Sequence, residues 1–298
     1  MSKQVRMVRG ERQRELVKLF DGLCDRHNRW QVWSDFITVF AISISNVVDR
    51  VHAEDREKTY MTLIKRYSDK ELSVFPEMMA HVVTGMEENM DQDFLGEMFM
   101  NLNMGNEHAG QFFTPYTVCK FMAKMNEPDI KGRVAEKGYF SVCDPTCGAG
   151  ALLVAFANEC LDQKVNYQTS VLFVAQDIDY VVGMMCYIQL SLIGAAGYVK
   201  IGNTLTDPLT THDPKGVIPV DKGDIWYTPF YFLDVWDARR RWAMLDIAIR
   251  SMASLGAMET PTDGSPLELP TPPEIIEEPE PFIQPVYAET ATGQLTFF

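Results

Sequence analysis

The spacing of apolar residues predicts helices throughout the first third of the chain. From Glu11 to about Asn101, glycine and proline are rare, and apolar residues recur at intervals of three and four. This is the spacing of one face of a helix. The most apolar stripe runs from Trp33 to Val47. Because packing in a core explains such stripes, we interpret residues 1–105 as a helical N-terminal subdomain.

The pattern changes to alternating strands and helices in residues 106–256. Three short apolar runs are typical of buried strands, and two longer stretches of helical composition separate them. In chain order these segments are 140–142, 151–159, 171–175, 180–193 and 198–201. Strands that alternate with helices predict an α/β fold with a parallel sheet. In such sheets, ligands bind outside the carboxyl ends of the strands.

A glycine-bearing turn joins the first predicted strand to its helix. It reads Asp144-Pro145-Thr146-Cys147-Gly148-Ala149-Gly150. Glycines allow a ligand close to the backbone, and a helix N-terminus offers free N–H donors. The acidic Asp144 would repel phosphate and attract an amine or hydroxyls. The turn therefore favours a nucleoside ligand with a cationic amino-acid end, such as S-adenosylmethionine, over a dinucleotide.

Two further turns are expected at the same edge of the sheet. Asp177 follows the second strand, where a carboxylate can accept hydrogen bonds from ribose hydroxyls. Asn203 follows the third strand in Gly-Asn-Thr-Leu. About 30 residues before the glycine turn, Thr114 and Pro115 form a helix start after an extended Gly-Gln-Phe-Phe.

Composition narrows the class of protein. The chain has 298 residues and a net charge of −14, which argues against broad, unaided binding to nucleic acid. No apolar run reaches the length of a membrane span, and the six cysteines form no metal-binding pattern, so we expect a cytoplasmic protein without a metal. Residues 257–298 are rich in acids and proline, and we predict a disordered tail.

A cluster of three arginines lies on a predicted helix at Asp237–Met252. The cluster is Arg239, Arg240 and Arg241. It is either a solvated helix face or a contact with nucleic acid, and we favour the solvated face.

Four motifs in order resemble the DNA adenine methyltransferases of the type I restriction–modification modification subunit family. They are GQFFTP, DPTCGAGALL, AQDID and GNTL, within about residues 90–205. The resemblance implies a doubly wound, mostly parallel, Rossmann-like methyltransferase sheet after a helical domain, S-adenosyl-L-methionine as cofactor and DNA as substrate. It implies a cofactor site of the following residues: Gln111, Phe113, Thr114, Pro115, Asp144, Gly148, Ala149, Gly150, Asp177 and Asn203.

The catalytic motif departs from the family pattern. Family enzymes hold the flipped adenine with Asn-Pro-Pro-Phe or Asn-Pro-Pro-Tyr after the fourth strand. The best match here is Tyr227-Thr228-Pro229-Phe230, in which Tyr227 cannot supply the amide oxygen of asparagine. The resemblance therefore leaves three readings open. In the first, the chain is an adenine methyltransferase that acts alone or is completed by a companion specificity or catalytic subunit. In the second, it is a non-catalytic DNA-associated relative. In the third, it is a methyltransferase that acts on protein or RNA.

The last five residues resemble the peptide that binds the bacterial sliding clamp. They read Gln294-Leu295-Thr296-Phe297-Phe298, with Phe297 in place of the usual leucine. An acidic tether that ends in such a peptide predicts docking of Gln294, Leu295, Phe297 and Phe298 in a groove of the clamp.

Overall fold

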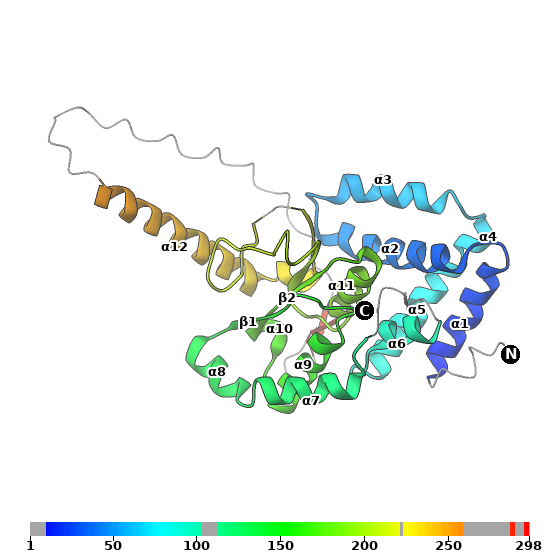
Figure 1. Ribbon diagram of the computed structural model, residues 1–298, viewed down its shortest axis with the longest axis horizontal. Helices are drawn as coiled ribbons and strands as arrows, with labels where there is room; N and C mark the ends of the chain where they lie inside the picture. The colour runs from blue at the N-terminus through cyan, green and yellow to red at the C-terminus, as the bar shows by residue number, and fades with distance from the viewer. Residues whose placement is uncertain (1–9, 103–112, 221–222, 259–286, 290–294, 298) are drawn as a thin grey trace.

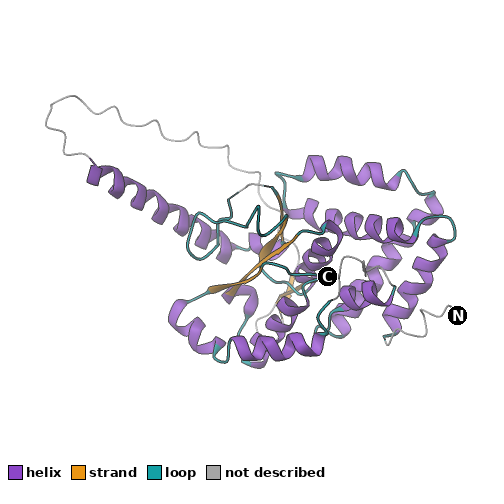
Figure 2. Ribbon diagram, viewed as in Figure 1, coloured by secondary structure: helices purple, strands orange, loops and turns teal. Residues whose placement is uncertain are grey.

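The computed structural model describes residues 10–102, 113–220, 223–258, 287–289 and 295–297. Helices dominate its N-terminal part, and a small sheet lies at the centre (Figures 1 and 2). The first helices are α1 (Glu11–Cys24), α2 (Arg29–Val48), α3 (Ala53–Ile64), α4 (Asp69–Leu72), α5 (Val74–Glu88) and α6 (Phe94–Asn101).

The helix α2 forms the centre of the helical part. Its apolar side chains are buried on nearly every face, and Trp33 lies edge-on to Phe20 of α1 at 5.9 Å between ring centroids. Among the described residues, α2 is the one helix long and apolar enough to cross a membrane. Since 67% of its most apolar window is buried inside the protein, packing in the core accounts for its composition.

The central sheet has four strands in the order β1-β2-β3-β4. They are β1 (Phe140–Asp144), β2 (Val171–Asp177), β3 (Gly197–Ile201) and β4 (Asp224–Tyr227). The first three are parallel, as predicted, and β4 runs antiparallel to β3 with Tyr198 opposite Tyr227. A mixed α/β fold with a mostly parallel sheet and a helical N-terminal part is therefore confirmed, although the sheet is small.

The remaining helices lie before, between and after the strands along the chain. They are α7 (Tyr116–Asn126), α8 (Ile130–Lys137), α9 (Ala151–Asp162), α10 (Tyr167–Ser170), α11 (Tyr180–Leu192), the 3-10 helix η2 (Pro229–Phe232) and α12 (Asp234–Met258). The crossover helices α9 and α11 both pack on the sheet face that carries Phe173 and Val199. The opposite face carries Leu172 and Val174 and is covered by η2 and the base of α12.

The expected double winding is not observed in the described part of the chain. The strand order runs in one direction from β1 to β4, and right-handed crossovers in one direction place their helices on the same face. As a result, β1 lies at an edge of the described sheet rather than at a central switch point.

The helical part and the sheet share one hydrophobic core. Buried side chains continue without a break from Leu16 of α1 through α2 and α11 to Trp226 of β4. Two short strands, β5 (Tyr287–Glu289) and β6 (Leu295–Phe297), pair with each other inside the segment predicted as a tail. The helix α12 extends away from the body (Figure 1).

Candidate functional site

The turn between β1 and α9 is held in its shape by two glycines in left-handed backbone. The φ angles are +56° at Gly148 and +93° at Gly150, a region that L side chains rarely adopt. A Cβ at Gly150 would lie 2.8 Å from Sγ of Cys186 on α11. The turn therefore packs closely against α11, and α9 begins directly after it at Ala151.

Asp177 ties the second strand to this turn. Its Oδ2 accepts a hydrogen bond from the Gly148 N–H at 2.9 Å, and its Oδ1 accepts one from the Asp179 N–H at 3.0 Å. Each carboxylate oxygen has a further lone pair, so both can accept a second hydrogen bond from a ligand. The side chain is only partly buried, and the residue after it, Ile178, is 67% exposed.

Asp144 lies beside Asp177 at the carboxyl ends of neighbouring strands. Burial raises the pKa of Asp144 above its usual value, and the negative charge of Asp177 raises it further, while a hydrogen bond from the Thr146 N–H opposes the shift. A carboxylate whose charge is disfavoured by burial and by a neighbouring carboxylate is stabilised by a nearby cation. This edge of the sheet therefore favours a positively charged ligand group.

The third turn closes against the first. The Thr204 hydroxyl donates to the Pro145 carbonyl at 2.5 Å, across 59 residues of sequence. Asn203 turns its side-chain oxygen toward its own loop, where it accepts the N–H groups of Leu205 and Thr206 at 2.9 and 3.3 Å. The oxygen of Asn203 is therefore occupied, and its NH₂ group is the part left to face a ligand.

Aromatic residues cover the glycine turn from the helical side. A Cβ at Gly148 would lie 3.6 Å from the Phe113 ring, which itself stacks on Phe99 of α6 at 5.4 Å. Thr114 and Pro115 follow with exposed side chains, and Pro115 precedes α7. The structure thus brings Phe113 to the turn, whereas Gln111 lies outside the described residues.

A buried polar network supports the turn from below. The Gln189 side chain donates from Nε2 to the Ala149 carbonyl and to Asp93 Oδ1, both at 2.8 Å. Its Oε1 accepts the Leu95 N–H at 3.1 Å. Gln189 is fully buried, so this amide fixes α6 and the glycine turn to α11. Sequence reasoning missed the network because Gln189 looks like one polar residue in an apolar helix.

Two cysteine thiols lie against each other under the turn. Cys147 contacts Cys186, and both are buried. The neighbouring Cys186 and burial together raise the pKa of Cys147 well above its usual value. A thiol with a raised pKa stays protonated and is a poor nucleophile, so Cys147 packs the turn and is not a reactive group.

Residues 91–222 match the model of the N-6 DNA methylase family. The match begins before α6, contains β1, β2, β3 and all three turns, and ends before β4. The resemblance predicted from the four motifs is therefore confirmed over this part of the chain. No curated protein matches the chain.

The residues proposed as a variant catalytic motif lie outside the N-6 DNA methylase match and away from the three turns. Because β4 is antiparallel, Tyr227 is opposite Tyr198 at the amino end of β3. The Thr228 hydroxyl donates to the Ala195 carbonyl at 2.7 Å, and Thr228 and Phe230 are fully buried. Tyr227 to Phe230 therefore lie at the opposite edge of the sheet from the three turns, and their catalytic role stays a prediction.

The arginine cluster divides between the body and solvent. Arg239 stacks over Trp236 and donates to the Thr169 carbonyl at 2.6 Å. Arg240 donates to the Tyr231 carbonyl and stacks over its ring at 4.3 Å. Arg241 is 79% exposed and pairs with Asp237 of the same helix. Two of the three arginines thus anchor α12 to the domain.

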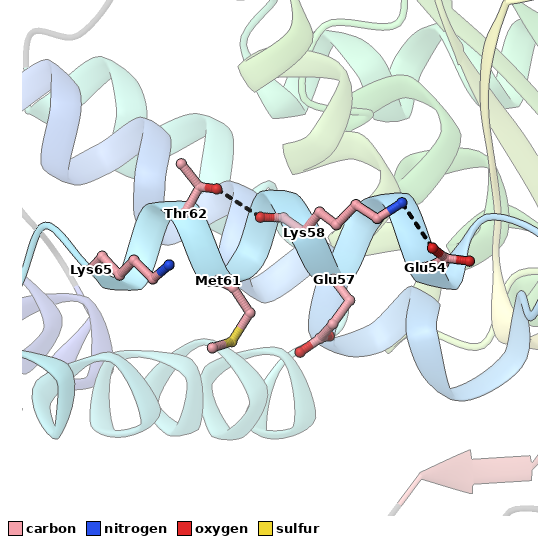
Figure 3. A pocket seen from close by; sticks show the side chains of 6 residues that line it. All are labelled: Glu54, Glu57, Lys58, Met61, Thr62 and Lys65. Carbon is pink, nitrogen blue, oxygen red and sulfur yellow. Dashed lines mark hydrogen bonds and ion pairs between the residues drawn. The ribbon is translucent and has the colours of Figure 1, made fainter.

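Two hollows in the described surface contain none of the predicted site residues. One, of about 490 Å³, is lined by Glu54, Glu57, Lys58, Met61, Thr62 and Lys65 (Figure 3). All six belong to α3 and its C-terminal end, and Lys58 is paired with Glu54, so the hollow is an outer groove of the helical part. The other, of about 360 Å³, lies between α7 and α9 near Lys120 and Asn158.

Proposed function

We propose that this chain binds S-adenosyl-L-methionine at the three turns and serves in methylation of the exocyclic amine of adenine in DNA. The observation that carries the proposal is the joining of the turns. Asp177 accepts from the Gly148 N–H, and Thr204 donates to the Pro145 carbonyl, so groups from three strands face one place. The match to the N-6 DNA methylase family supports the reaction class.

The chemistry of the residues present fits this cofactor. Asp144 and Asp177 favour the cationic amine, and the remaining lone pairs of Asp177 suit ribose hydroxyls. The exposed Ile178 offers an apolar face for a purine ring, and the NH₂ group of Asn203 can donate to a ring nitrogen. When bound, the cofactor supplies an electrophilic methyl group.

The groups that hold the target adenine are proposed to come from a companion subunit. The sequence contains no Asn-Pro-Pro-Phe or Asn-Pro-Pro-Tyr, and Tyr227 to Phe230 lie at the other edge of the sheet. In the described part of the chain β1 is an edge strand, so its carboxyl end at Asp144 is open on one side to a partner. A companion would also supply the contacts to DNA phosphates that a chain of charge −14 makes poorly.

Cofactor binding is tested by calorimetry with S-adenosylmethionine and its demethylated product. Asp144→Asn is expected to weaken binding about tenfold or more, the loss expected from one charge-assisted contact of about 1.5 kcal/mol. Glu136→Gln on α8 is the matched control, since it removes one exposed carboxylate away from the turns. Absence of binding by the folded wild-type chain at millimolar ligand would overturn the proposal.

Transfer to DNA is tested separately with a labelled methyl donor. The chain alone is expected to leave adenine unmethylated, and the chain with its companion is expected to methylate it. If Tyr227→Phe abolished transfer while cofactor binding and folding were unchanged, the motif at the opposite edge would be catalytic and the companion model would be wrong.

The C-terminal peptide carries a second proposed function, docking to a sliding clamp. Leu295–Phe297 form β6 and have the extended backbone that a groove-binding peptide uses, while Gln294 and Phe298 lie outside the described residues. Since β6 pairs with β5, docking would replace this strand pairing by contacts between β6 and the groove of the clamp. Deletion of residues 294–298 is expected to abolish capture by the clamp, and capture that survives the deletion refutes this function.

A further inference from the structure

The outer part of α12 carries an exposed apolar stripe. Trp242, Leu245, Ile249 and Met252 are 72%, 49%, 56% and 73% exposed. They follow one another at intervals of three, four and three residues, which is the a/d spacing of a coiled coil. Figure 1 shows this part of the helix extending away from the body.

The base of α12 is firmly attached, and only its outer part lacks support. Trp236 is fully buried, and its Nε1 donates to the Gln168 carbonyl at 2.7 Å. From Arg241 to Met252 the side chains are exposed, apart from partly buried Ala243 and Ile247. A helix of this length that packs against nothing is only marginally stable in water, because helices in proteins depend on tertiary packing.

The charges beside the stripe select a partner. With Trp242 at position a, Arg241 occupies position g and Asp246 occupies position e. In a parallel pair of identical helices, position g faces position e of the partner five residues further on, so each Arg241 faces an Asp246. In an antiparallel pair in which Leu245 of one helix packs against Ile249 of the other, Asp246 of one helix would lie opposite Asp246 of the other. Within one helix Arg241 pairs with Asp237 and Asp246 pairs with Arg250, and both pairs are exposed and weak enough for a facing helix to replace them. Of the two arrangements, only the parallel one sets Arg241 against Asp246.

We propose that a second copy of this chain packs in parallel against α12 through Trp242, Leu245, Ile249 and Met252. Both bodies then lie at the same end of the paired helices, since each α12 is anchored at its N-terminal base. The contact spans little more than one heptad of described stripe, so it is a reversible dimer whose population depends on concentration. It uses no residue of the three turns.

The stripe is tested by analytical ultracentrifugation of the full chain over a range of concentrations. The wild type is expected to sediment as a monomer–dimer equilibrium. Ile249→Glu is expected to weaken the dimer by at least tenfold. The matched control is Met244→Glu, which changes an apolar residue of the same helix with 54% exposure that lies off the stripe. A wild type that stays monomeric at all concentrations, or a dimer that Met244→Glu breaks and Ile249→Glu does not, overturns the proposal.

The parallel orientation is tested by mixing two charge variants. In a homodimer of Arg241→Glu, both contacts between the helices place Glu opposite Asp246, and the like charges repel. In a homodimer of Asp246→Arg, both contacts place Arg opposite Arg241. Each alone is expected to dimerise several-fold more weakly than the wild type, and an equimolar mixture is expected to recover dimer through two opposite-charge contacts. A mixture that dimerises no better than either variant refutes the parallel pairing.

Hydrogen exchange separates the second copy from another occupant. In the dimer, amides of residues 241–252 are expected to be protected in proportion to protein concentration. Protection that is independent of concentration in a monomer would assign the stripe to another segment of the same chain and would overturn the proposal.

Discussion

Asp93 is a buried carboxylate whose described hydrogen-bond partners are all uncharged. It begins α6, where its Oδ1 accepts the Gly96 N–H at 3.0 Å and the Gln189 Nε2 at 2.8 Å. Burial raises its pKa to about 6, although these two hydrogen bonds favour the charged form. Asp93 therefore holds the network under the glycine turn at a site where burial disfavours its charged form.

We predict that Asp93→Asn flattens the dependence of stability on pH. A carboxyl whose pKa is near 4 unfolded and about 6 folded favours the folded state at low pH. That contribution is lost as the pH rises from about 4 through about 6, by about 2 to 3 kcal/mol. Asparagine keeps the acceptor and the helix cap without this loss. Urea unfolding from pH 4 to 7 measures the difference between variant and wild type.

The control is Asp129→Asn, which changes an exposed aspartate that caps α8 by the same contact to a glycine N–H. It is expected to keep the wild-type dependence on pH. If Asp93→Asn also kept that dependence, the raised pKa of Asp93 would be wrong.

At the scale of elements, the local parts of the fold were predictable and the long-range parts were not. The strands ending at Asp144, Asp177 and Ile201 follow from short apolar runs before turns, and the structure has all three. The direction of β4 depends on pairing with β3 and on the Thr228 hydroxyl bound at Ala195, neither of which has a local signal. The match to a family motif therefore does not show that Tyr227 to Phe230 lie at the opposite edge of the sheet from the three turns.

The same limit applies to the candidate site. The position of Asp144 and Asp177 at strand ends could be predicted, because an acid after a short apolar run is a local pattern. The support of the glycine turn by Gln189 could not be predicted, since the contacts of Gln189 to Asp93 and Ala149 span 96 and 40 residues. The strand order β1-β2-β3-β4, which runs in one direction, could not be predicted from the sequence either, because packing across the whole sheet sets it.

The turn between β1 and α9 gives a prediction at this scale. Gly150→Ala is expected to destabilise the protein by about 2 to 4 kcal/mol, from a left-handed φ and from overpacking against Cys186. Gly138→Ala is the control, because Gly138 has a φ of +73° and nothing within 4 Å of a Cβ. The difference in unfolding free energy between the variants measures the close approach of the turn to α11. Equal losses would contradict that approach.

At the scale of the whole molecule, Arg56 joins the helical part to the sheet. Its guanidinium, on α3, pairs with Asp49 at 2.6 Å and donates to the Ile225 carbonyl of β4 at 2.8 Å. It also lies over the Trp226 ring at 3.9 Å. Because the hydrophobic core is continuous across this junction, we expect the two parts to unfold together.

We predict that Arg56→Met lowers the free energy of unfolding by about 3 to 5 kcal/mol, because it leaves the buried Asp49 without its main cation. Arg56→Met with Asp49→Asn is expected to recover part of that loss, since the unpaired charge is gone. The control is Arg12→Met, which breaks an exposed pair with Glu88 and is expected to change stability little. A loss in Arg56→Met no larger than in Arg12→Met would show that Arg56 does not link the two parts.

Circular dichroism and tryptophan fluorescence are expected to give coincident unfolding transitions in the wild type. Separate transitions would show that the helical part and the sheet unfold independently.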